Sequence, residues 1–405
     1  MSTRIYSAVV IGLVLLPVLP CCDNGSSKDG KRQGLFRGNL ERTGAYEGRL
    51  KSGALSLRKV FAADADVLST PAINQGIAYF TTQMGTLFAV NIAEARMLWS
   101  VKTLQYVKSD QPASSLLELS SSPSICDGVV YFGAPDGLRA VEATTGKELW
   151  TFETKEAILS SPAVFHGVVY FGCNDGILYA LEIKLKRCIW QYKSDGAIIS
   201  SPAISEGRVV FGSRDGGVYA VRADNGVLLW RFAAGGEVTC TPGIGGGMVF
   251  FASGNGTFYS VCIASGKEQW KFEYGPFPCR SWTSPVVMQD GVFFAVDLNG
   301  TDGPKVEQGE IRTRGDAMVK LERETGKFAP AFTVKNSSWL PVVSSPIVVG
   351  NRLVFCDFFG IFKQVNVRTG RVVMEMHLPT SPTSSFTFVE GALYFGGDSC
   401  LYELK

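Results

Sequence analysis

Short apolar segments separated by glycine and proline recur along the chain from residue 71 onward. In each unit a Ser/Thr-Pro step opens a short apolar run, and a turn ending in Gly leads to an alternating strand such as VVYFG. An Asp-Gly or Asn-Gly turn, a strand such as LYAL and one further strand complete the unit. Such turns accept positive φ and favour hairpins. Each unit therefore predicts four antiparallel strands, which is one propeller blade.

The unit occurs eight times. Its opening step carries proline at seven positions and phenylalanine at the eighth: Pro71, Pro123, Pro162, Pro202, Pro242, Pro285, Pro346 and Phe386. Five of the seven intervals between these residues are 39 to 43 residues long. A fixed period of this size, with strands rich in Val, Ile, Phe and Tyr, is typical of propeller blades. A helical repeat is excluded because Pro and Gly interrupt the pattern too often for a sustained 3.6-residue period.

The two ends of the repeat region complete one another. Unit eight supplies three strands, near residues 386–389, 391–396 and 400–404, and residues 54–61 (ALSLRKVF) have no unit of their own. We expect residues 54–61 to form the outer strand of the last blade, because this pairing hides two sheet edges. The sequence therefore predicts an all-β, eight-bladed β-propeller over residues 54–405, with four-stranded antiparallel blades closed by an N-terminal strand.

Composition supports this architecture and limits the function. Hydrophobic residues make up 46% of the chain, charged residues 19%, and there are 45 glycines, as expected for short buried strands joined by tight turns. The formal net charge is only +2. Lysine and arginine are scattered rather than gathered in a stripe, which argues against a nucleic-acid partner.

The first 22 residues have the features of an export signal. Arg4 precedes an apolar segment, residues 8–19, that is too short to span a bilayer well. The following Leu19-Pro20-Cys21-Cys22 resembles a bacterial lipoprotein signal and implies acylation of Cys22; an ordinary secretory signal is the alternative. Residues 23–53 are expected to be a flexible tether and lead-in. The protein should be exported and anchored by lipid to the outer or the inner membrane, facing the periplasm.

Three stretches identify the repeat family: AVEATTGKELW at 140–150, AVRADNGVLLW at 220–230 and SVCIASGKEQW at 260–270. They resemble the repeats named after pyrroloquinoline quinone (PQQ), and FRGNLERTGAYEG from residue 36 resembles the lead-in of such proteins. The resemblance implies that one Trp of each blade packs against the neighbouring blade. The Trp residues in that position are Trp99, Trp150, Trp190, Trp230 and Trp270. Near the corresponding place, units six to eight have Phe328 or Phe332, Val373, and Val60 or Phe61.

The resemblance leaves two main classes of function. Large quinoprotein dehydrogenases bind PQQ and Ca²⁺, whereas smaller lipoproteins such as the BamB-type outer-membrane assembly lipoproteins are non-enzymatic scaffolds. Here the blades leave little length for a quinone pocket, and no Cys-x-x-Cys-His haem motif occurs. We therefore expect no catalytic residues, no cofactor, and a monomeric scaffold that binds envelope proteins such as barrel-assembly components. A PQQ-dependent oxidoreductase and a ligand-sensing propeller are the alternatives.

Candidate sites lie in two insertions, residues 298–315 and 104–118, and at two tryptophans outside the docking position, Trp282 and Trp339. Asp297, Asn299 and Asp302 lie where a Gly-rich insertion begins in unit six and could offer oxygen ligands to Ca²⁺, although a solvated loop is the simpler interpretation. A rim for a partner or ligand is expected from these residues: Arg280, Trp282, Trp339, Leu116 and Leu117. Cys240–Cys279 and Cys173–Cys188 are conceivable disulfides, and the sequence does not decide between paired and free thiols.

Overall fold

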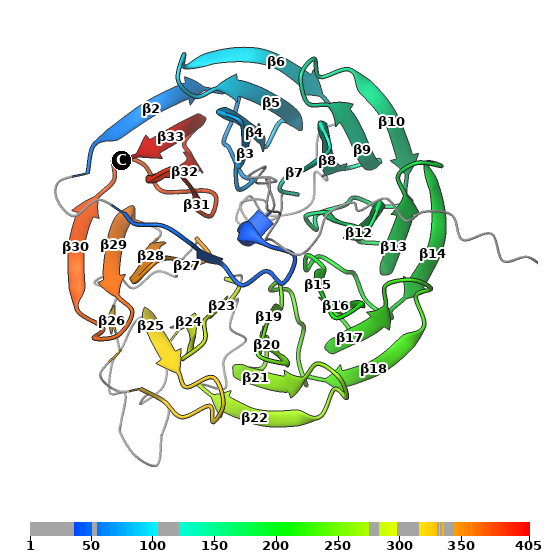
Figure 1. Ribbon diagram of the computed structural model, residues 1–405, viewed down its shortest axis with the longest axis vertical. Coiled ribbons are helices and arrows are strands. Elements are labelled where there is room, and N and C mark those ends of the chain that lie inside the picture. The colour runs from blue at the N-terminus through cyan, green and yellow to red at the C-terminus, as the bar shows by residue number, and fades with distance from the viewer. Residues whose placement is uncertain are drawn as a thin grey trace, which may run out of the picture.

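The computed structural model describes residues 36–50, 55–103, 121–274, 283–297, 316–329, 332, 334–335, 344–357 and 359–405. Over these residues the chain forms eight sheets arranged as a closed ring (Figure 1). Seven sheets have four strands and one has a fifth strand. The predicted eight-bladed propeller is confirmed. The described ranges contain no helix long and apolar enough to cross a membrane.

The first four blades follow one another along the chain, each from an inner strand at the channel to an outer strand at the rim. Their strands are β3 (Ala72–Asn74), β4 (Ile77–Thr81), β5 (Thr86–Asn91) and β6 (Arg96–Lys102); β7 (Ser124–Cys126), β8 (Val129–Ala134), β9 (Gly137–Glu142) and β10 (Glu148–Glu153); β11 (Ala163–Phe165), β12 (Val168–Gly172), β13 (Ile177–Glu182) and β14 (Arg187–Lys193); β15 (Ala203–Ser205), β16 (Arg208–Gly212), β17 (Gly217–Arg222) and β18 (Leu228–Ala233).

The last four blades continue the same order, and the N-terminal segment adds strands to two of them. Their strands are β19 (Gly243–Gly245), β20 (Met248–Ser253), β21 (Thr257–Cys262) and β22 (Glu268–Glu273); β23 (Val286–Val287), β24 (Val292–Asp297), β25 (Asp316–Leu321) and β26 (Val334–Lys335); β27 (Ile347–Val349), β28 (Arg352–Cys356), β29 (Ile361–Asn366) and β30 (Val372–His377), with β1 (Ala45–Tyr46); β31 (Thr387–Val389), β32 (Ala392–Gly397) and β33 (Cys400–Leu404), with β2 (Leu57–Ala62).

The tight turn between the two inner strands shows how the sequence sets each blade. In blade four Glu206 and Gly207 have φ of 50° and 70°, and they join β15 to β16 in antiparallel register. Two successive residues with positive φ make the turn whose twist matches a hairpin. Glycine at the second position therefore removes half of the strain of that turn.

The ring closes at blade eight. β2 pairs antiparallel with β33, which joins Leu57 to Leu404 and Ala62 to Cys400. The expected closing strand, residues 54–61, is thus observed at Leu57–Ala62. The N-terminal segment also contributes β1, which pairs in parallel with β27 on the inner side of blade seven.

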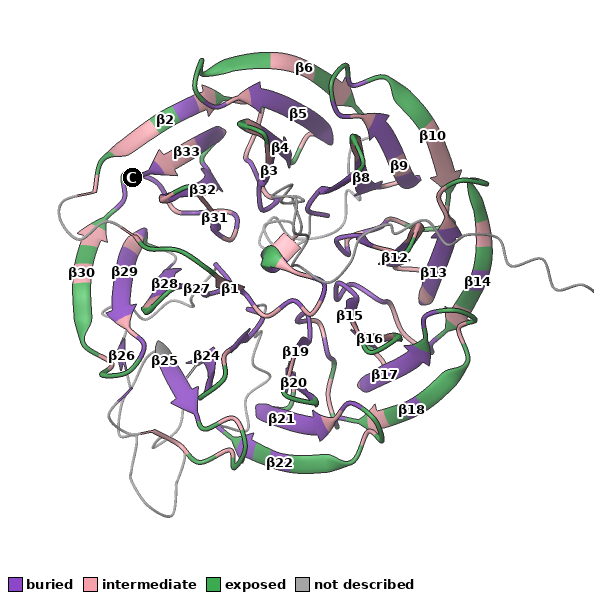
Figure 2. Ribbon diagram, viewed as in Figure 1, coloured by how far each residue is buried: buried purple, intermediate pink, exposed green. Residues whose placement is uncertain are grey.

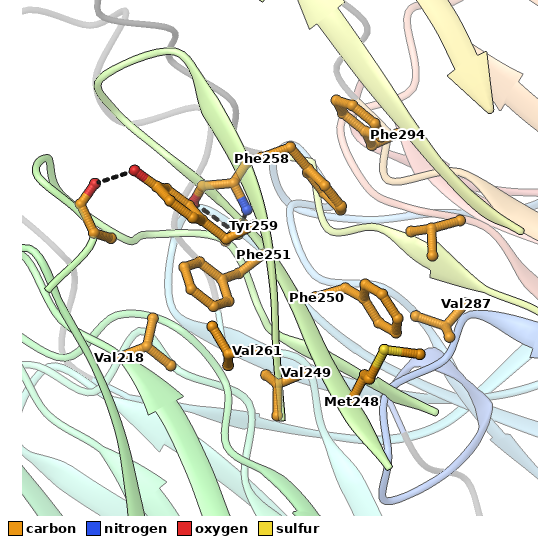
Figure 3. Close-up of a cluster of buried hydrophobic side chains, with 14 of the residues drawn as sticks. Val218, Met248, Val249, Phe250, Phe251, Phe258, Tyr259, Val261, Val287 and Phe294 are labelled. Carbon is orange, nitrogen blue, oxygen red and sulfur yellow. Dashed lines mark hydrogen bonds between the residues drawn. The ribbon is translucent and has the colours of Figure 1, made fainter. Parts of the chain in front are cut away.

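The core lies between neighbouring blades rather than at the centre of the ring. Inner strands are buried, whereas outer strands such as β18 and β22 carry exposed residues (Figure 2). Between blades five and six the rings of Phe258 and Phe294 stack with centroids 4.0 Å apart (Figure 3). Phe251 packs on the opposite side, toward Val218 of blade four (Figure 3). Each blade therefore buries both faces of its sheet against its neighbours.

Candidate functional site

A chain of hydroxyl groups links the inner ends of the blades. The residue before each proline donates its N–H to the hydroxyl of the equivalent residue in the next blade, over 2.9 to 3.2 Å. The residues joined in order are Thr70, Ser122, Ser161, Ser201, Thr241, Ser284, Ser345 and Ser385. The repeated Ser/Thr-Pro step thus satisfies buried backbone donors from one blade to the next.

The lead-in crosses the channel on these inner ends. Backbone carbonyls of residues 40, 41, 43 and 44 accept N–H groups from the inner strands of blades four, five, six and seven. For example, Ile204 of β15 donates to Leu40 over 2.8 Å, and Val287 of β23 donates to Thr43 over 2.9 Å. Figure 1 shows this segment, drawn in blue with η1 (Phe36–Gly38), across the middle of the ring. Residues 36–46 are therefore packed into the propeller.

Two arginines of the lead-in extend its contacts. Arg42 donates from Nη2 to the carbonyl of Pro162 and from Nε to that of Pro202, each over 3.1 Å. Arg37 donates from Nε to the carbonyl of Arg42 over 3.2 Å and from Nη2 to that of Pro285. The side chains thus reach blades three, four and six at the prolines that define the repeat.

Burial dominates the electrostatics of this pair. Arg37 is 2% exposed and Arg42 is 0% exposed. Desolvation lowers the pKa of Arg37 to about 10. Desolvation, followed by repulsion from Arg37, lowers the pKa of Arg42 to about 9. Both guanidinium groups remain protonated at neutral pH, so the channel has a concentrated positive charge.

A second contact recurs between the outer strand of one blade and a carbonyl of the next. Trp Nε1 donates to Ala143 from Trp99, to Ala223 from Trp190, to Ile263 from Trp230 and to Arg323 from Trp270, over 2.8 to 3.0 Å. We call these acceptors the docking carbonyls. The tyrosine hydroxyls of Tyr79 and Tyr170 also donate to the docking carbonyls at 143 and 223.

Glycine makes room for each docked indole. A Cβ at Gly226 would lie 2.6 Å from the ring of Trp190, and Gly146, Gly266 and Gly326 meet the other rings at 2.5 to 2.6 Å. Trp150 differs, because the following blade has Lys186 (φ 52°) at this position. Glycine at this turn therefore provides the space into which the preceding blade's Trp packs.

Where the Trp series ends, charged side chains reach the next blade from blades six and eight, whereas blade seven has a neutral methionine in the register position of Trp. In blade eight Arg58 lies opposite Glu403, which is the position equivalent to that of Trp190 opposite Ala180 in blade three. Arg58 donates to the carbonyl of Ile92 in blade one over 3.0 Å. In blade six Lys320 approaches the carbonyl of Val367 at 3.5 Å. The sequence placed Val60 or Phe61 near the position of Trp in blade eight, whereas in the structure Arg58 occupies it. In blade seven Met374, next to Val373, lies opposite Gln364.

The outer surface carries a shallow groove of mixed polarity between blades three and four. It encloses about 720 Å³ and is lined by residues from the turns and outer strands of these blades, including Phe165, Ile189, Arg208, Arg222 and Leu229. Arg222 is paired with Asp224 at 2.6 Å, and Arg208 with Glu206 at 3.1 Å. Both ion pairs lie within blade four.

All five residues of the expected rim lie outside the described ranges. These are Arg280, Trp282, Trp339, Leu116 and Leu117, and the same holds for Cys22, Asn299 and Asp302. Asp297 is the last residue of β24. Cys173 and Cys188 are both free thiols, Cys240 is also free, and Cys279 falls outside the described residues.

The described residues show no assembled set of Ca²⁺ ligands. Ca²⁺ requires several oxygen ligands, carboxylates foremost. Over the described residues, no group of three or more His, Cys, Asp or Glu side chains is placed to hold a metal. The two fully buried charged side chains of the lead-in are the cations Arg37 and Arg42, and the half-buried Glu41 accepts a hydrogen bond from Ser205. Nothing in the sequence pattern marked these arginines beyond their place in the lead-in.

Comparison with known proteins places the chain among the PQQ-repeat propellers. The family model described as "Outer membrane protein assembly factor BamB" matches residues 134–239 and 189–399. BamB from Moraxella catarrhalis is 17% identical with a TM-score of 0.65, and the match covers 88% of this chain and 99% of that one. No match is found among curated proteins.

Two quinoprotein enzymes share the fold as well. Quinohemoprotein alcohol dehydrogenase from Comamonas testosteroni is 14% identical with a TM-score of 0.70, covering 92% of this chain and 80% of that one. A europium-containing methanol dehydrogenase is 13% identical with a TM-score of 0.70, covering 91% of each chain. At these identities the structural likeness establishes the fold and leaves the function open.

Proposed function

This chain belongs to the family of the outer-membrane protein assembly factor BamB, and from that premise we propose that it is a non-enzymatic scaffold of the bacterial cell envelope that acts in outer-membrane protein assembly. The family match over residues 134–399 carries the proposal. The channel supports it, because the chain's own lead-in and two buried cations lie where a ring-shaped enzyme would hold a ligand.

A rigid ring with an irregular outer surface suits a scaffold. In the described part of the chain ten large apolar side chains are exposed. Seven lie on blades one to four, namely Met97, Leu149, Leu185, Ile189, Val227, Leu228 and Leu229, and three lie on blade seven, namely Phe359, Val372 and Val373. Exposed apolar groups gathered on one arc are typical of partner contacts. We also propose a second contact region, made of Arg280, Trp282, Trp339, Leu116 and Leu117. We further propose that acylation at Cys22 anchors the scaffold to the membrane.

Crosslinking in intact cells tests the assembly role. A tagged wild-type chain should retain components of the barrel-assembly machinery after crosslinking and stringent washing, well above an untagged control. Recovery of those components at the control level would refute the assembly role.

The anchor is tested by fractionation. Cys22→Ala should move the protein from the membrane to the soluble fraction, whereas Cys188→Ala, far from the signal, should leave it membrane-bound. A Cys22→Ala protein that stays in the membrane fraction without lipid would exclude Cys22 as the anchor.

Quinone binding separates the scaffold from the oxidoreductase. Titration of the purified protein with PQQ and Ca²⁺, followed by tryptophan fluorescence, should give no saturable change. Stoichiometric, tight binding would overturn the non-enzymatic proposal even if the crosslinking result holds.

A further inference from the structure

The channel holds two buried cations without a carboxylate. Arg37 and Arg42 are almost fully buried, and neither forms an ion pair with an Asp or Glu of the described ranges. Their described partners are backbone carbonyls. Buried charges in proteins are normally paired, because removing an ion from water costs several kcal/mol. Carbonyl dipoles offset part of this cost, but they leave the net positive charge in place.

Hydrogen-bond accounting identifies the incomplete group. Arg42 uses Nε, Nη1 and Nη2, which donate to Pro202, Phe36 and Pro162. Arg37 uses Nε and Nη2, whereas its Nη1 is buried and has no acceptor. A guanidinium Nη1 carries two N–H donors, and an unsatisfied buried donor costs about 1–3 kcal/mol, more when charged.

The lead-in is shaped around this guanidinium. A Cβ at Gly44 would lie 2.5 Å from Nη2 of Arg37, at a φ of +68°. Glycine therefore lets the backbone turn closely past Arg37. The side chain is held on two sides, by Arg42 and Pro285, and only Nη1 lacks a protein partner.

We propose that a small monovalent anion, of the size and charge of chloride, binds Nη1 of Arg37 in the channel and neutralises the Arg37–Arg42 pair. A monovalent anion suits this place because the carbonyl oxygens bound to the same guanidinium groups repel a higher negative charge. A small anion also loses less hydration energy on burial than a divalent oxyanion would. The site is independent of the scaffold function proposed above.

Bromide diffraction tests the site on the wild-type protein. Crystals grown in sodium bromide should show an anomalous peak within about 3.5 Å of Nη1 of Arg37, which is hydrogen-bonding range for a large acceptor. A carboxylate of the chain at that position would overturn the proposal, and so would Nη1 without a peak while bromide is ordered elsewhere.

Thermal stability gives a second, solution test. A ligand that binds the folded state stabilises it by RT ln(1 + [L]/Kd), so above Kd each tenfold rise in chloride should raise Tm by roughly 2 °C for a ring of this size. Sodium gluconate at the same ionic strength separates binding from screening. Arg37→Met should lose the chloride dependence. Arg222→Met, which removes an exposed arginine paired with Asp224, should keep it.

Equal Tm curves in chloride and gluconate for the wild type would overturn the proposal. A chloride dependence that persists in Arg37→Met would overturn it too, because the anion would then bind elsewhere. If Arg37→Met does not fold, the bromide experiment on the wild type still decides.

Discussion

The seat of Trp190 on Gly226 allows the contact between blades to be measured. A Cβ at Gly226 would lie 2.6 Å from the indole, and the glycine has a φ of +71°. Gly207 has a φ of +70° but no atom within 4 Å of an added Cβ. Alanine at Gly207 therefore introduces only backbone strain, whereas alanine at Gly226 introduces the same strain and a clash with Trp190.

These geometries set the expected free energies of unfolding. A non-glycine residue in left-handed backbone costs about 1–2 kcal/mol, which is the expected loss for Gly207→Ala. Overpacking adds about 1–3 kcal/mol, so Gly226→Ala should lose about 2–5 kcal/mol. Trp190→Ala removes a side chain that is 9% exposed and should lose about 3–5 kcal/mol. Once Trp190 is absent, Gly226→Ala should cost no more than Gly207→Ala.

Urea unfolding at 25 °C, followed by far-UV circular dichroism in reducing buffer, measures the four terms of this double-mutant cycle. Coincident transitions by fluorescence would justify two-state analysis. The cycle should give a coupling energy of about 1–3 kcal/mol between positions 190 and 226. Equal costs for Gly226→Ala and Gly207→Ala in the wild-type background would refute the packing argument. So would a cost of Gly226→Ala that is unchanged in Trp190→Ala.

Two further predictions concern the closure of the ring and its response to alkali. Arg58→Ala should lower the free energy of unfolding in urea by about 1–2 kcal/mol, because it removes a partly exposed, charged hydrogen bond to Ile92. Arg96→Ala is the control. It breaks only an exposed ion pair with Glu94 and should change the free energy of unfolding by less than about 0.5 kcal/mol. Burial raises the pKa of Tyr79 to about 12 from an unfolded value of 10.0. Between pH 10 and 12 the unfolded state therefore binds fewer protons than the folded state, and the free energy of unfolding should fall as pH rises. Tyr79→Phe should make this fall less steep, and an unchanged dependence of the urea midpoint on pH would contradict the assignment.

The architecture follows from the sequence because its determinants are local and repeated. Pro162 and Pro202 mark blades of one period, and the Glu206-Gly207 turn specifies a hairpin from two residues. The closing strand was also predictable, because a unit of three strands and a spare apolar segment complete each other. This pairing follows from the need to cover the unpaired backbone N–H and C=O groups at the edge of the three-stranded sheet.

The residue that closes the ring was not predictable from hydrophobic pattern. A register shift between Lys59 and Phe61 places Arg58 in the docking position. Blade one has Ala95, with a φ of 53°, at the place where blade two has Gly146. The guanidinium of Arg58 reaches the carbonyl of Ile92 in that blade over 3.0 Å. A side chain at the seat does not by itself exclude an indole, because Trp150 is followed by a blade with Lys186 at this position. The pairing register, which no single repeat reveals, therefore decides that Arg58 takes the docking position.

The channel arginines were missed for a related reason. Arg42 contacts Pro162 and Pro202, which lie 120 and 160 residues away in sequence. No periodicity within the lead-in indicates such contacts. The signal that remains is chemical, namely two cations in a short Gly-containing segment that precedes an apolar ring.

The N-terminal segment contacts the ring in two places, at the inner strands along the channel and at the outer edge of blade eight. Its residues 40–46 pair with the inner strands of blades four to seven, while β2 completes blade eight and Arg58 joins it to blade one. A neutral indole from blades one, three, four and five donates to the docking carbonyl of the following blade. Lys320 and Arg58 bring charge to the remaining arc. Because the partly exposed charge of Arg58 is screened by salt and indole packing is not, high ionic strength should weaken the contact between blades eight and one before the Trp-docked contacts.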